Sequence, residues 1–496
     1  GGVGLWSMMA SSSSGPESGP EVATQAVPDR PSAPSAIGTE EDPHARARYQ
    51  WRRLRNPETG EIPDGIRKRE LQFASGLPDK VRQKSTSDTT TGGVSGGIWR
   101  STDGGTNWTE TTNPSQRRSI TDLEQDPRSG NRDVWYAGSG EGRGNSANGG
   151  DAFFSGNGIY RSTDGGQSWT LLSSTTSSLV RSSGDFDFVW DIEVDPSNTN
   201  QEEVYAATWT GIHRSTDGGS NWTRTLNVTN SIYSEVEVGP NGNVYAAVGG
   251  QGVFTSPDGQ NWTNQNPSGF PSDLDERTVL DISPQNPNNV WFLLNSNNGS
   301  GPNGHELWRW NNTTQSWTEF TNYLPQRGGQ TGTFNSQSNY DLILHVHPDD
   351  ANTVFVGGRN LWRLDVSGGS SDAETWIGGY TANNNSFNFY SPSGSDAHHP
   401  DQHRIAFRPS NGDVMYVGSD GGVHRTDDSR AGSSGSAGDK AVKWTSLNRG
   451  YQTTQFYAVC AHPTDDLIAG GMQDNGTIST SIQRPEDQWN RELGAD

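Results

Sequence analysis

Short apolar or alternating segments, separated by clusters of Gly, Pro, Asp and Ser, follow one another from about residue 92 to the end of the chain. Residues 159–162 (Ile-Tyr-Arg-Ser) alternate in polarity, whereas residues 204–207 (Val-Tyr-Ala-Ala) are apolar except for the tyrosine hydroxyl. Both patterns are typical of β-strands. The chain contains 62 Gly and 26 Pro, which punctuate it at short intervals and indicate a turn-dense, all-β protein.

A hairpin unit recurs along the chain. A strand is followed by Ser-Thr-Asp-Gly-Gly and then by Trp in residues 97–108, 158–169 and 211–222, and a looser copy ends the same way in residues 256–262. Asp can bond its own backbone two residues on and Gly supplies positive φ, so each copy predicts a tight turn and a return strand. We expect these repeated side chains to be structural: Asp103, Trp108, Asp164, Trp169, Asp217, Trp222, Asp258 and Trp262.

A second element precedes each hairpin and consists of an apolar strand, a turn containing Pro and another strand. Examples are the turns at Pro127 and Pro196, followed by apolar residues 134–137 and 204–207. Two strands from this element and two from the hairpin make a four-stranded blade. We therefore predict a β-propeller of about seven to eight four-stranded blades. Because the end falls inside a repeat, we expect the chain to be a fragment, truncated at its C-terminus.

The repeats do not cover the whole chain. Residues 1–40 are rich in Ser, Pro and Gly and cannot bury enough apolar area to offset their ordering entropy, so we expect a disordered leader. Residues 41–78 are charged, with Ala, Leu, Ile and Trp, and predict a short helical segment. Residues 79–91 form the expected linker, and residues 92–496 the propeller.

The pattern Ser-x-Asp-x-Gly-x-x-Trp resembles the Asp-box, or BNR repeat, of sialidases, xyloglucan-cleaving glycosidases, sortilin-type receptors and photosystem assembly-factor propellers. Further segments resemble the large secreted BNR-propeller proteins of Bacteroidetes-type bacteria, namely residues 93–97, 140–142, 399–403, 418–422 and 471–477. The resemblance implies an extracellular or cell-surface propeller. It also implies that the Asp-boxes lie on the outer edges of the blades, away from the central channel.

The net charge of -22 makes a nucleic-acid partner improbable, because phosphates would be repelled. No stretch is apolar for long enough to span a bilayer, so no membrane insertion is expected. The scarcity of Lys and excess of acid suit a halophilic protein, and ordinary acidic solubility explains them equally well. The single cysteine, Cys460, lies in the apolar run 456–461, where we expect a buried structural thiol.

Polar clusters that interrupt the repeats are the candidate functional residues. In residues 398–403 (His-His-Pro-Asp-Gln-His), His399, Asp401 and His403 could bind a ligand, form an acid–base pair or hold a divalent cation. The alternative is a hydrogen-bonded loop that joins two blades. No complete metal motif is present, so no cofactor or metal is predicted.

Asp420 and Asp474 each follow an apolar strand and lie in a Gly-rich turn, where a carboxylate can face a channel mouth. The segment around Asp420 resembles the part of xyloglucan-cleaving enzymes in which an Asp acts in a two-carboxylate mechanism, and glycoside hydrolysis requires such a pair. Asp-Gly is also a common tight-turn pair, so both residues have a structural explanation as well. Gln473 and Asn475, on either side of Asp474, are candidate ligand-binding residues. Glu141 and Arg143, in the Gly-rich loop 139–146, are further candidates.

Three functions remain open from the sequence. The first is a secreted or cell-surface binding module that recognises a carbohydrate or protein ligand through loops at the channel. The second is a glycoside hydrolase that uses Asp401, Asp420 or Asp474 as its carboxylates. The third is an assembly factor for a protein complex. The absence of a complete catalytic set favours the binding module.

Overall fold

The computed structural model describes residues 89–93, 96–113, 115–116, 119–142, 155–177, 184–228, 233–267, 277–296, 299–337, 340–368, 373–381, 388–409, 411–432, 441–451, 453, 456–461, 467–472, 476–481 and 490–493. The predictions for residues 1–40 and 41–78 lie outside these ranges. The first described strand begins at Thr89, within the segment predicted to be a linker.

The described residues form antiparallel sheets in which the strands follow sequence order. One sheet has three strands: β1 (Thr89–Gly93), β2 (Gly97–Ser101) and β3 (Thr109–Glu110). Three four-stranded sheets follow: β4 (Ile120–Gln125), β5 (Trp135–Ser139), β6 (Ile159–Ser162) and β7 (Thr170–Leu171); β8 (Val189–Val194), β9 (Val204–Thr208), β10 (Gly211–Ser215) and β11 (Thr223–Asn227); β12 (Ser234–Val238), β13 (Val244–Val248), β14 (Gly252–Ser256) and β15 (Thr263–Asn264).

Four more four-stranded sheets complete the series: β16 (Thr278–Ile282), β17 (Asn289–Asn295), β18 (His305–Asn311) and β19 (Ser316–Glu319); β20 (Ile343–Val346), β21 (Thr353–Gly357), β22 (Leu361–Asp365) and β23 (Glu374–Gly378); β24 (Gln402–Arg408), β25 (Asn411–Ser419), β26 (Gly422–Thr426) and β27 (Thr445–Ser446); β28 (Phe456–Ala461), β29 (Ile468–Met472), β30 (Gly476–Thr480) and β31 (Asn490–Leu493). Helical structure among these residues is limited to single turns, such as α3 (Gly329–Gly332).

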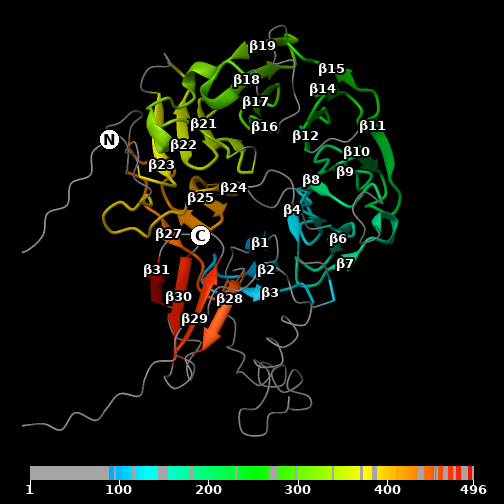
Figure 1. Ribbon diagram of the computed structural model, residues 1–496. Coiled ribbons are helices and arrows are strands. Elements are labelled where there is room, and N and C mark those ends of the chain that lie inside the picture. The colour runs from blue at the N-terminus through cyan, green and yellow to red at the C-terminus, as the bar shows by residue number, and fades with distance from the viewer. Residues whose placement is uncertain are drawn as a thin grey trace, which may run out of the picture. The chain divides into compact units, whose positions relative to one another are not determined.

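Seven of these eight sheets, from β1–β3 to β24–β27, are the blades of a seven-bladed β-propeller, which confirms the predicted all-β fold. The first strands of successive sheets, from β4 to β24, contact one another and form the inner ring of strands (Figure 1). The ring closes where Trp99 and Trp108 of the three-stranded sheet pack on Val414 and Tyr416 of β25. The Trp108 indole N–H also donates a hydrogen bond of 2.7 Å to the Leu447 carbonyl. The sheet β28–β31 follows this closed ring along the chain.

The three-stranded blade lacks a counterpart of the inner strand among the described residues. Strands β2 and β3 form the Asp-containing hairpin, which is made by the third and fourth strands in the neighbouring blades. Strand β1 therefore corresponds to a second strand, and it contacts β4 as β5 contacts β8.

The repeated Asp turns have one hydrogen-bonding pattern. In the first copy, the Ser101 hydroxyl donates to Asp103 at 2.8 Å, and the same carboxylate accepts the Asn107 backbone N–H at 2.9 Å. The copies at Asp164, Asp217 and Asp258 repeat both contacts. These carboxylates are therefore engaged within their own turns.

In two of these hairpins, the tryptophan that ends the hairpin donates a hydrogen bond to the preceding blade. The Trp169 indole N–H donates to the Thr111 hydroxyl at 3.0 Å, and the Trp262 indole N–H to the Thr225 hydroxyl at 3.2 Å. Trp222 differs, because its N–H bonds the carbonyl of Gly219 in its own turn. The rings fill the space between sheets, where large apolar area stabilises packing.

The prediction that Cys460 is buried was wrong. Cys460 lies in β28 and is exposed. An apolar run identifies a strand, but whether either face of that strand is covered depends on what packs against it.

Candidate functional site

Strand direction determines which connections meet at one end of the propeller. In each antiparallel blade, the connection from the second to the third strand and the connection from the fourth strand to the next blade lie at the same end. We call this end the mouth face. Glu141 follows the second strand β5, Asp420 joins β25 to β26, and Asp401 precedes β24, so all three lie on the mouth face. The Asp turns lie on the opposite face.

Five side chains on the mouth face form one group, which we call the mouth cluster: Glu141, Asp341, Asp401, His403 and Asp420. His403 Nε2 donates to Asp420 at 2.6 Å. The backbone N–H of Asp420 donates to the carbonyl of Asp401 at 3.2 Å. After burial, the charges of Asp401 and Asp420 raise the pKa of Asp341, and the charge of Asp420 raises the pKa of Glu141, so these carboxyl groups lie close enough to interact electrostatically.

Tyr340 and Gln337, which both precede β20 in the chain, hold the carboxylates in place. The Tyr340 hydroxyl donates to the Asp420 oxygens at 3.2 and 3.3 Å, and its ring meets the His403 ring edge-on at 5.0 Å. The Gln337 amide donates to Asp401. Three blades therefore supply the groups that surround Asp420.

Asp401 has a left-handed backbone conformation, with φ of 61°. This conformation costs a non-Gly residue about 1 kcal/mol and is maintained here by surrounding contacts. The Asp401 N–H donates to the Arg359 carbonyl at 3.0 Å, and the Gln402 N–H to the Gly358 carbonyl at 2.9 Å. The turn is thus anchored to the neighbouring blade in a shape that places Asp401 beside Asp420.

Two carboxyl groups of the cluster are buried and incompletely bonded. Asp341 is fully buried and its Oδ1 has no hydrogen-bond partner, while Glu141 is 7% exposed and its Oε2 has none. Burial, followed by the charges of Asp401 and Asp420, raises the pKa of Asp341. Burial and the charge of Asp420 raise the pKa of Glu141 to about 8. Both shifts favour the protonated form of these carboxyl groups.

His403 has the opposite tendency. Burial disfavours its charged form, but the charge and hydrogen bond of Asp420, together with Asp401, raise the pKa of His403 above its ordinary value. The cluster consequently contains a close His403–Asp420 pair beside two carboxyl groups whose pKa values are raised. Perturbed pKa values grouped in this way are typical of functional sites.

Aromatic side chains surround the cluster. Next to Asp420, a side chain at Gly421 would collide with His399, whose ring packs edge-on against Phe389 at 4.8 Å. Phe389 in turn meets Tyr380 at 5.8 Å. On the other side, Gly142 lies directly over the Trp190 indole, so any side chain there would collide with the ring.

Below the mouth, carboxylates bridge the inner strands. Each carboxylate accepts a hydrogen bond from a backbone N–H on the inner strand of the next blade. Because the inner strand lies at the edge of its sheet, this N–H pairs with no other strand. Asp122 accepts from Ile192, Asp191 from Val236, Glu235 from Leu280 and Asp281 from Val346.

Arg404 of β24 reaches two of these carboxylates, Asp122 and Asp191. Its guanidinium lies 3.2 Å from Asp122 and 3.9 Å from Asp191. The charges of Asp122 and Asp191 outweigh burial and raise the pKa of Arg404. Burial and the charge of Asp122 raise the pKa of Asp191, although Arg404 opposes this. Arg404 is thus the counter-ion of an acidic channel wall.

The structure places four of the candidate residues, Glu141, Asp401, His403 and Asp420, close together. His399 lies beside them and its Nδ1 donates to the carbonyl of Pro400 at 3.0 Å. The other candidate residues lie outside the described residues: Arg143, Gln473, Asp474 and Asn475.

Sequence reasoning missed Asp341, Tyr340, Gln337 and the channel carboxylates. A signal for the channel was present, since acidic residues occupy alternate positions in strands β4, β8 and β12 (Asp122/Glu124, Asp191/Glu193 and Glu235/Glu237). Asp341 and Tyr340 lie in a connection with no such pattern, and only the fold brings them to Asp420.

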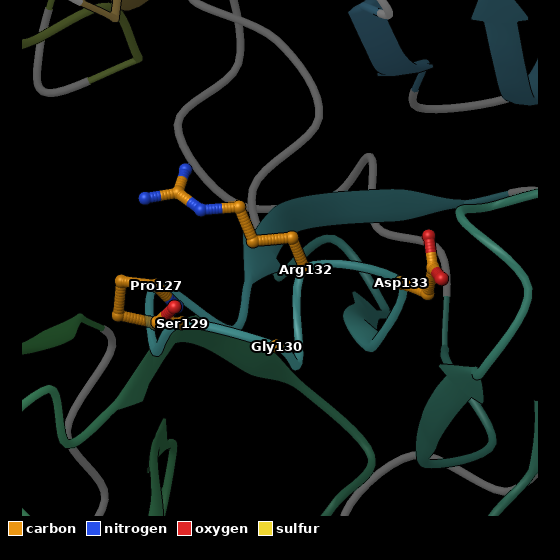
Figure 2. Close-up of a pocket in the computed structure, with 5 residues that line it drawn as sticks. All are labelled: Pro127, Ser129, Gly130, Arg132 and Asp133. Atoms are coloured by element: carbon orange, nitrogen blue, oxygen red, sulfur yellow. The ribbon is translucent and has the colours of Figure 1, made fainter.

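A small hollow of about 390 Å³ lies on the opposite face, between β4 and β5. Figure 2 shows Pro127, Ser129 and Gly130 along one turn, with the Arg132 side chain extending away from it. This hollow belongs to the turn between a first and a second strand and is separate from the mouth cluster.

Within the described ranges, no group of three or more His, Cys, Asp or Glu side chains is arranged to hold a metal ion. In that part of the chain, no helix is long and apolar enough to cross a membrane.

Comparison with known proteins identifies the fold. No protein-family model and no curated protein matches the chain. Among solved structures it is similar, at TM-score 0.53 in each case, to three GH74 proteins. These are an ancestral GH74 enzyme (16% identity, covering 80% of this chain and 52% of that one), the GH74 enzyme of Niastella koreensis (18%, 81% and 58%), and the GH74 xyloglucanase of Xanthomonas campestris (13%, 78% and 56%).

The similarity is one of fold. At such identities it shows the propeller architecture alone, and the chain spans between about half and three-fifths of the length of these structures. Fold similarity does not determine the function of the mouth cluster, which depends on the chemistry of its own residues.

Proposed function

We propose that the mouth face cleaves glycosidic bonds, with Asp420 as the ionised carboxylate and Glu141 as the proton donor. One observation carries this proposal: within a single cluster, Asp420 accepts a hydrogen bond of 2.6 Å from His403, while burial and Asp420 raise the pKa of Glu141 to about 8. Glycoside hydrolysis needs one ionised and one protonated carboxyl group together.

The chemistry follows from the two protonation states. The carboxyl proton of Glu141 passes to the glycosidic oxygen as the bond from that oxygen to the anomeric carbon breaks. The carboxylate of Asp420 either removes a proton from the attacking water or bonds the anomeric carbon itself, with water releasing the sugar in a second step. In both cases the products are two shorter sugars and one water is consumed.

The remaining cluster residues have supporting roles in this proposal. His403 and Tyr340 orient Asp420 through their hydrogen bonds, and the raised pKa of Asp341 favours a neutral carboxyl group near Asp401 and Asp420. A sialidase function, which would need three arginines around an anionic sugar, receives no support from a cluster dominated by carboxyl groups. We also propose an extracellular or cell-surface location, which the resemblance of the repeats implies.

A binding module without catalysis is the second candidate. The observation in its favour is burial: Glu141 is only 7% exposed and Asp341 is fully covered, which limits access of water and of a sugar ring to the acids. In that case the cluster would recognise a carbohydrate or a protein without cleaving a bond.

The test is to incubate the protein with a panel of neutral and charged polysaccharides and to measure hydrolysis as the release of reducing ends. We expect Glu141→Gln and Asp420→Asn each to lower the rate at least about 100-fold, the scale of general acid–base catalysis. Glu319→Gln, an exposed carboxylate on the outer strand β19, serves as the matched control and should leave the rate unchanged.

The outcomes separate the candidates. Binding of a polysaccharide without release of reducing ends would establish the binding module and exclude the hydrolase. Cleavage that persists in both site variants, while both remain folded by circular dichroism, would refute the assignment of Glu141 and Asp420.

A further inference from the structure

The first blade, β1–β3, has an open strand edge on its channel side. Strand β1 pairs with β2, and no strand among the described residues pairs with the other edge of β1. The Ile98 carbonyl of β2 accepts the Thr111 N–H from the β3 side, so the backbone groups of Ile98 point away from β1. Because antiparallel partners alternate between bonded and non-bonded pairs, the N–H groups of Thr90 and Gly92 face the open edge.

The blade that precedes this edge around the ring has an uncovered aromatic residue. In the second strands β5, β9, β13, β17 and β21, one aromatic side chain lies in an apolar cluster with the inner strand of the next blade. These five side chains are at most 1% exposed: Tyr136, Tyr205, Tyr245, Trp291 and Phe355. Tyr416 has the same position in β25, next to the first blade, and is 9% exposed. Part of the surface that the other rings give to an inner strand is therefore uncovered at Tyr416.

Strand β4, on the other side of the open edge, shows the same difference. Strands β4 and β8 have the same register and bulge against their second strands, which makes Leu123 the counterpart of Ile192. Ile192 is fully buried and its N–H donates to Asp122 of the preceding inner strand. Leu123 is only partly buried, and in the described part of the chain no carboxylate accepts its N–H. An inner strand in the first blade would supply both the apolar cover and the acceptor.

Arg404 lies where the inner ring lacks this strand. By register it is the counterpart of Asp122 and Asp191, whose carboxylates each accept an N–H of the next inner strand. The Arg404 guanidinium instead extends past the first blade to Asp122, at 3.2 Å, and the Arg404 side chain is 58% exposed. An exposed ion pair contributes about 0–1 kcal/mol, so an entering strand could displace it at little cost.

We infer that the open edge of β1 binds an extended segment of another protein, which adds as the inner strand of the first blade. Backbone hydrogen bonds to Thr90 and Gly92 would hold the segment, and its alternate side chains would give specificity. The face toward the blades has to be apolar, because it meets Tyr416 and Leu123. The face toward the channel has to be polar and uncharged, since a further carboxylate there would meet Asp122.

Two segments of this chain could compete for the same edge, and neither fits it. Strand β28 follows the seventh blade along the chain, but it is already paired with β29 in its own sheet. Residues 79–88 precede β1 and contain a single apolar residue, Val81, so they lack the alternating pattern of the inner strands. A partner with that pattern is therefore the occupant that the edge favours.

The probe is a synthetic peptide with the sequence of residues 188–195, which includes β8, and with the changes Asp191→Asn, Glu193→Gln and Asp195→Asn to remove charge. In β8 the Ile192 N–H points away from β9, so the N–H of the next residue points toward β9. Two further peptides carry one backbone N-methyl group, on residue 192 or on residue 193. Each lacks one N–H, but only the methyl group on residue 193 would lie between the peptide and β1.

The measurement is isothermal titration calorimetry with the full chain. We expect the peptide methylated on residue 193 to bind at least about 10-fold more weakly than the one methylated on residue 192, because it loses a bond and blocks the pairing. Thr90→Pro removes an N–H from the open edge and leaves the bonds to β2, so it should weaken binding of the unmethylated peptide by a similar factor. Thr90→Ala keeps the N–H and should bind as the wild type does.

Each result supports or overturns the inference. Absence of binding would overturn it, and this is also the result expected if another part of the chain or a second copy occupies the edge. Equal binding of the two methylated peptides, or unchanged binding by Thr90→Pro, would overturn it because the peptide would then lie elsewhere. If Thr90→Pro does not fold, the methylated peptides decide the question with the wild-type protein. Glycosidase activity is not needed for any of these results, so failure of the proposed function would leave them unchanged.

Discussion

Replacement of Glu141 by Gln should make the protein more stable at alkaline pH. The variant keeps the shape of the side chain and removes its titration. In the folded wild-type protein, burial and Asp420 raise the pKa of Glu141 to about 8, whereas an unfolded chain has the ordinary Glu value of about 4.3. Between these two values the folded state binds the proton more strongly than the unfolded state.

The sign follows from proton linkage. Below about pH 4.3 both states are protonated, and Glu141 has no pH-dependent effect on stability. As pH rises to about 8, the unfolded state gains the ionised form that the folded state resists, so wild-type stability falls. Each pKa unit corresponds to about 1.4 kcal/mol, and the interval gives an upper limit of about 5 kcal/mol. Water can enter the site when the group ionises, which reduces the difference below this limit. We therefore expect a measured difference of at least about 2 kcal/mol.

The assay is urea unfolding between pH 5 and pH 9, followed by tryptophan fluorescence. The quantity of interest is the free energy of unfolding of Glu141→Gln minus that of the wild type at each pH. This difference cancels the titration of groups that both proteins share, such as Glu235, whose pKa burial raises to about 7. Glu319→Gln provides the control for removal of one surface charge.

The reasoning would be refuted by parallel stability curves. If Glu141→Gln follows the wild type within about 0.5 kcal/mol from pH 5 to pH 9, then Glu141 is not buried and protonated in solution. The proton donor in the proposed mechanism would then have to be another residue.

Three further substitutions test the framework around the site. Arg404→Met should cost about 1 kcal/mol, because Asp122 and Asp191 lose their counter-ion but the Arg404 side chain is 58% exposed, and urea unfolding should show a larger loss at pH 8 than at pH 5; equal losses would argue against the ion pairs. Asp164→Ala should cost about 1–2 kcal/mol, since it removes several hydrogen bonds from its turn, and an unchanged melting temperature would contradict this. Trp376→Ala should cost about 3–5 kcal/mol, because the ring is buried against Trp362, and a smaller loss in urea would show that the core collapses around the vacancy.

The blade could be predicted from the sequence because its determinants are local. The residues that bond to Asp103 or Asp164 lie within four positions along the chain, so the turn motif contains its own partners. The position of Trp169 after such a turn also predicts a ring between sheets, although the partner of its N–H, Thr111, belongs to the preceding blade.

The composition of the mouth cluster could be predicted only in part. Asp401, His403 and Asp420 come from one blade and lie close in sequence, and a Gly-rich loop indicated Glu141. Asp341 shows the limit: it lies in an irregular connection with no motif, and nothing in its neighbourhood along the chain predicts contact with Asp420.

The sequence alone determined the repeat, the strands, the Asp turns and the excess of acidic residues, because each depends on residue type and nearest neighbours. The tertiary structure alone decided that seven blades close, that Glu141 and Asp341 meet the Asp420–His403 pair, and that Cys460 is exposed. Ring closure brings distant strand ends to one face and removes their carboxyl groups from water. Protonation depends on that burial and on neighbouring charges, and both exist only after the chain has folded.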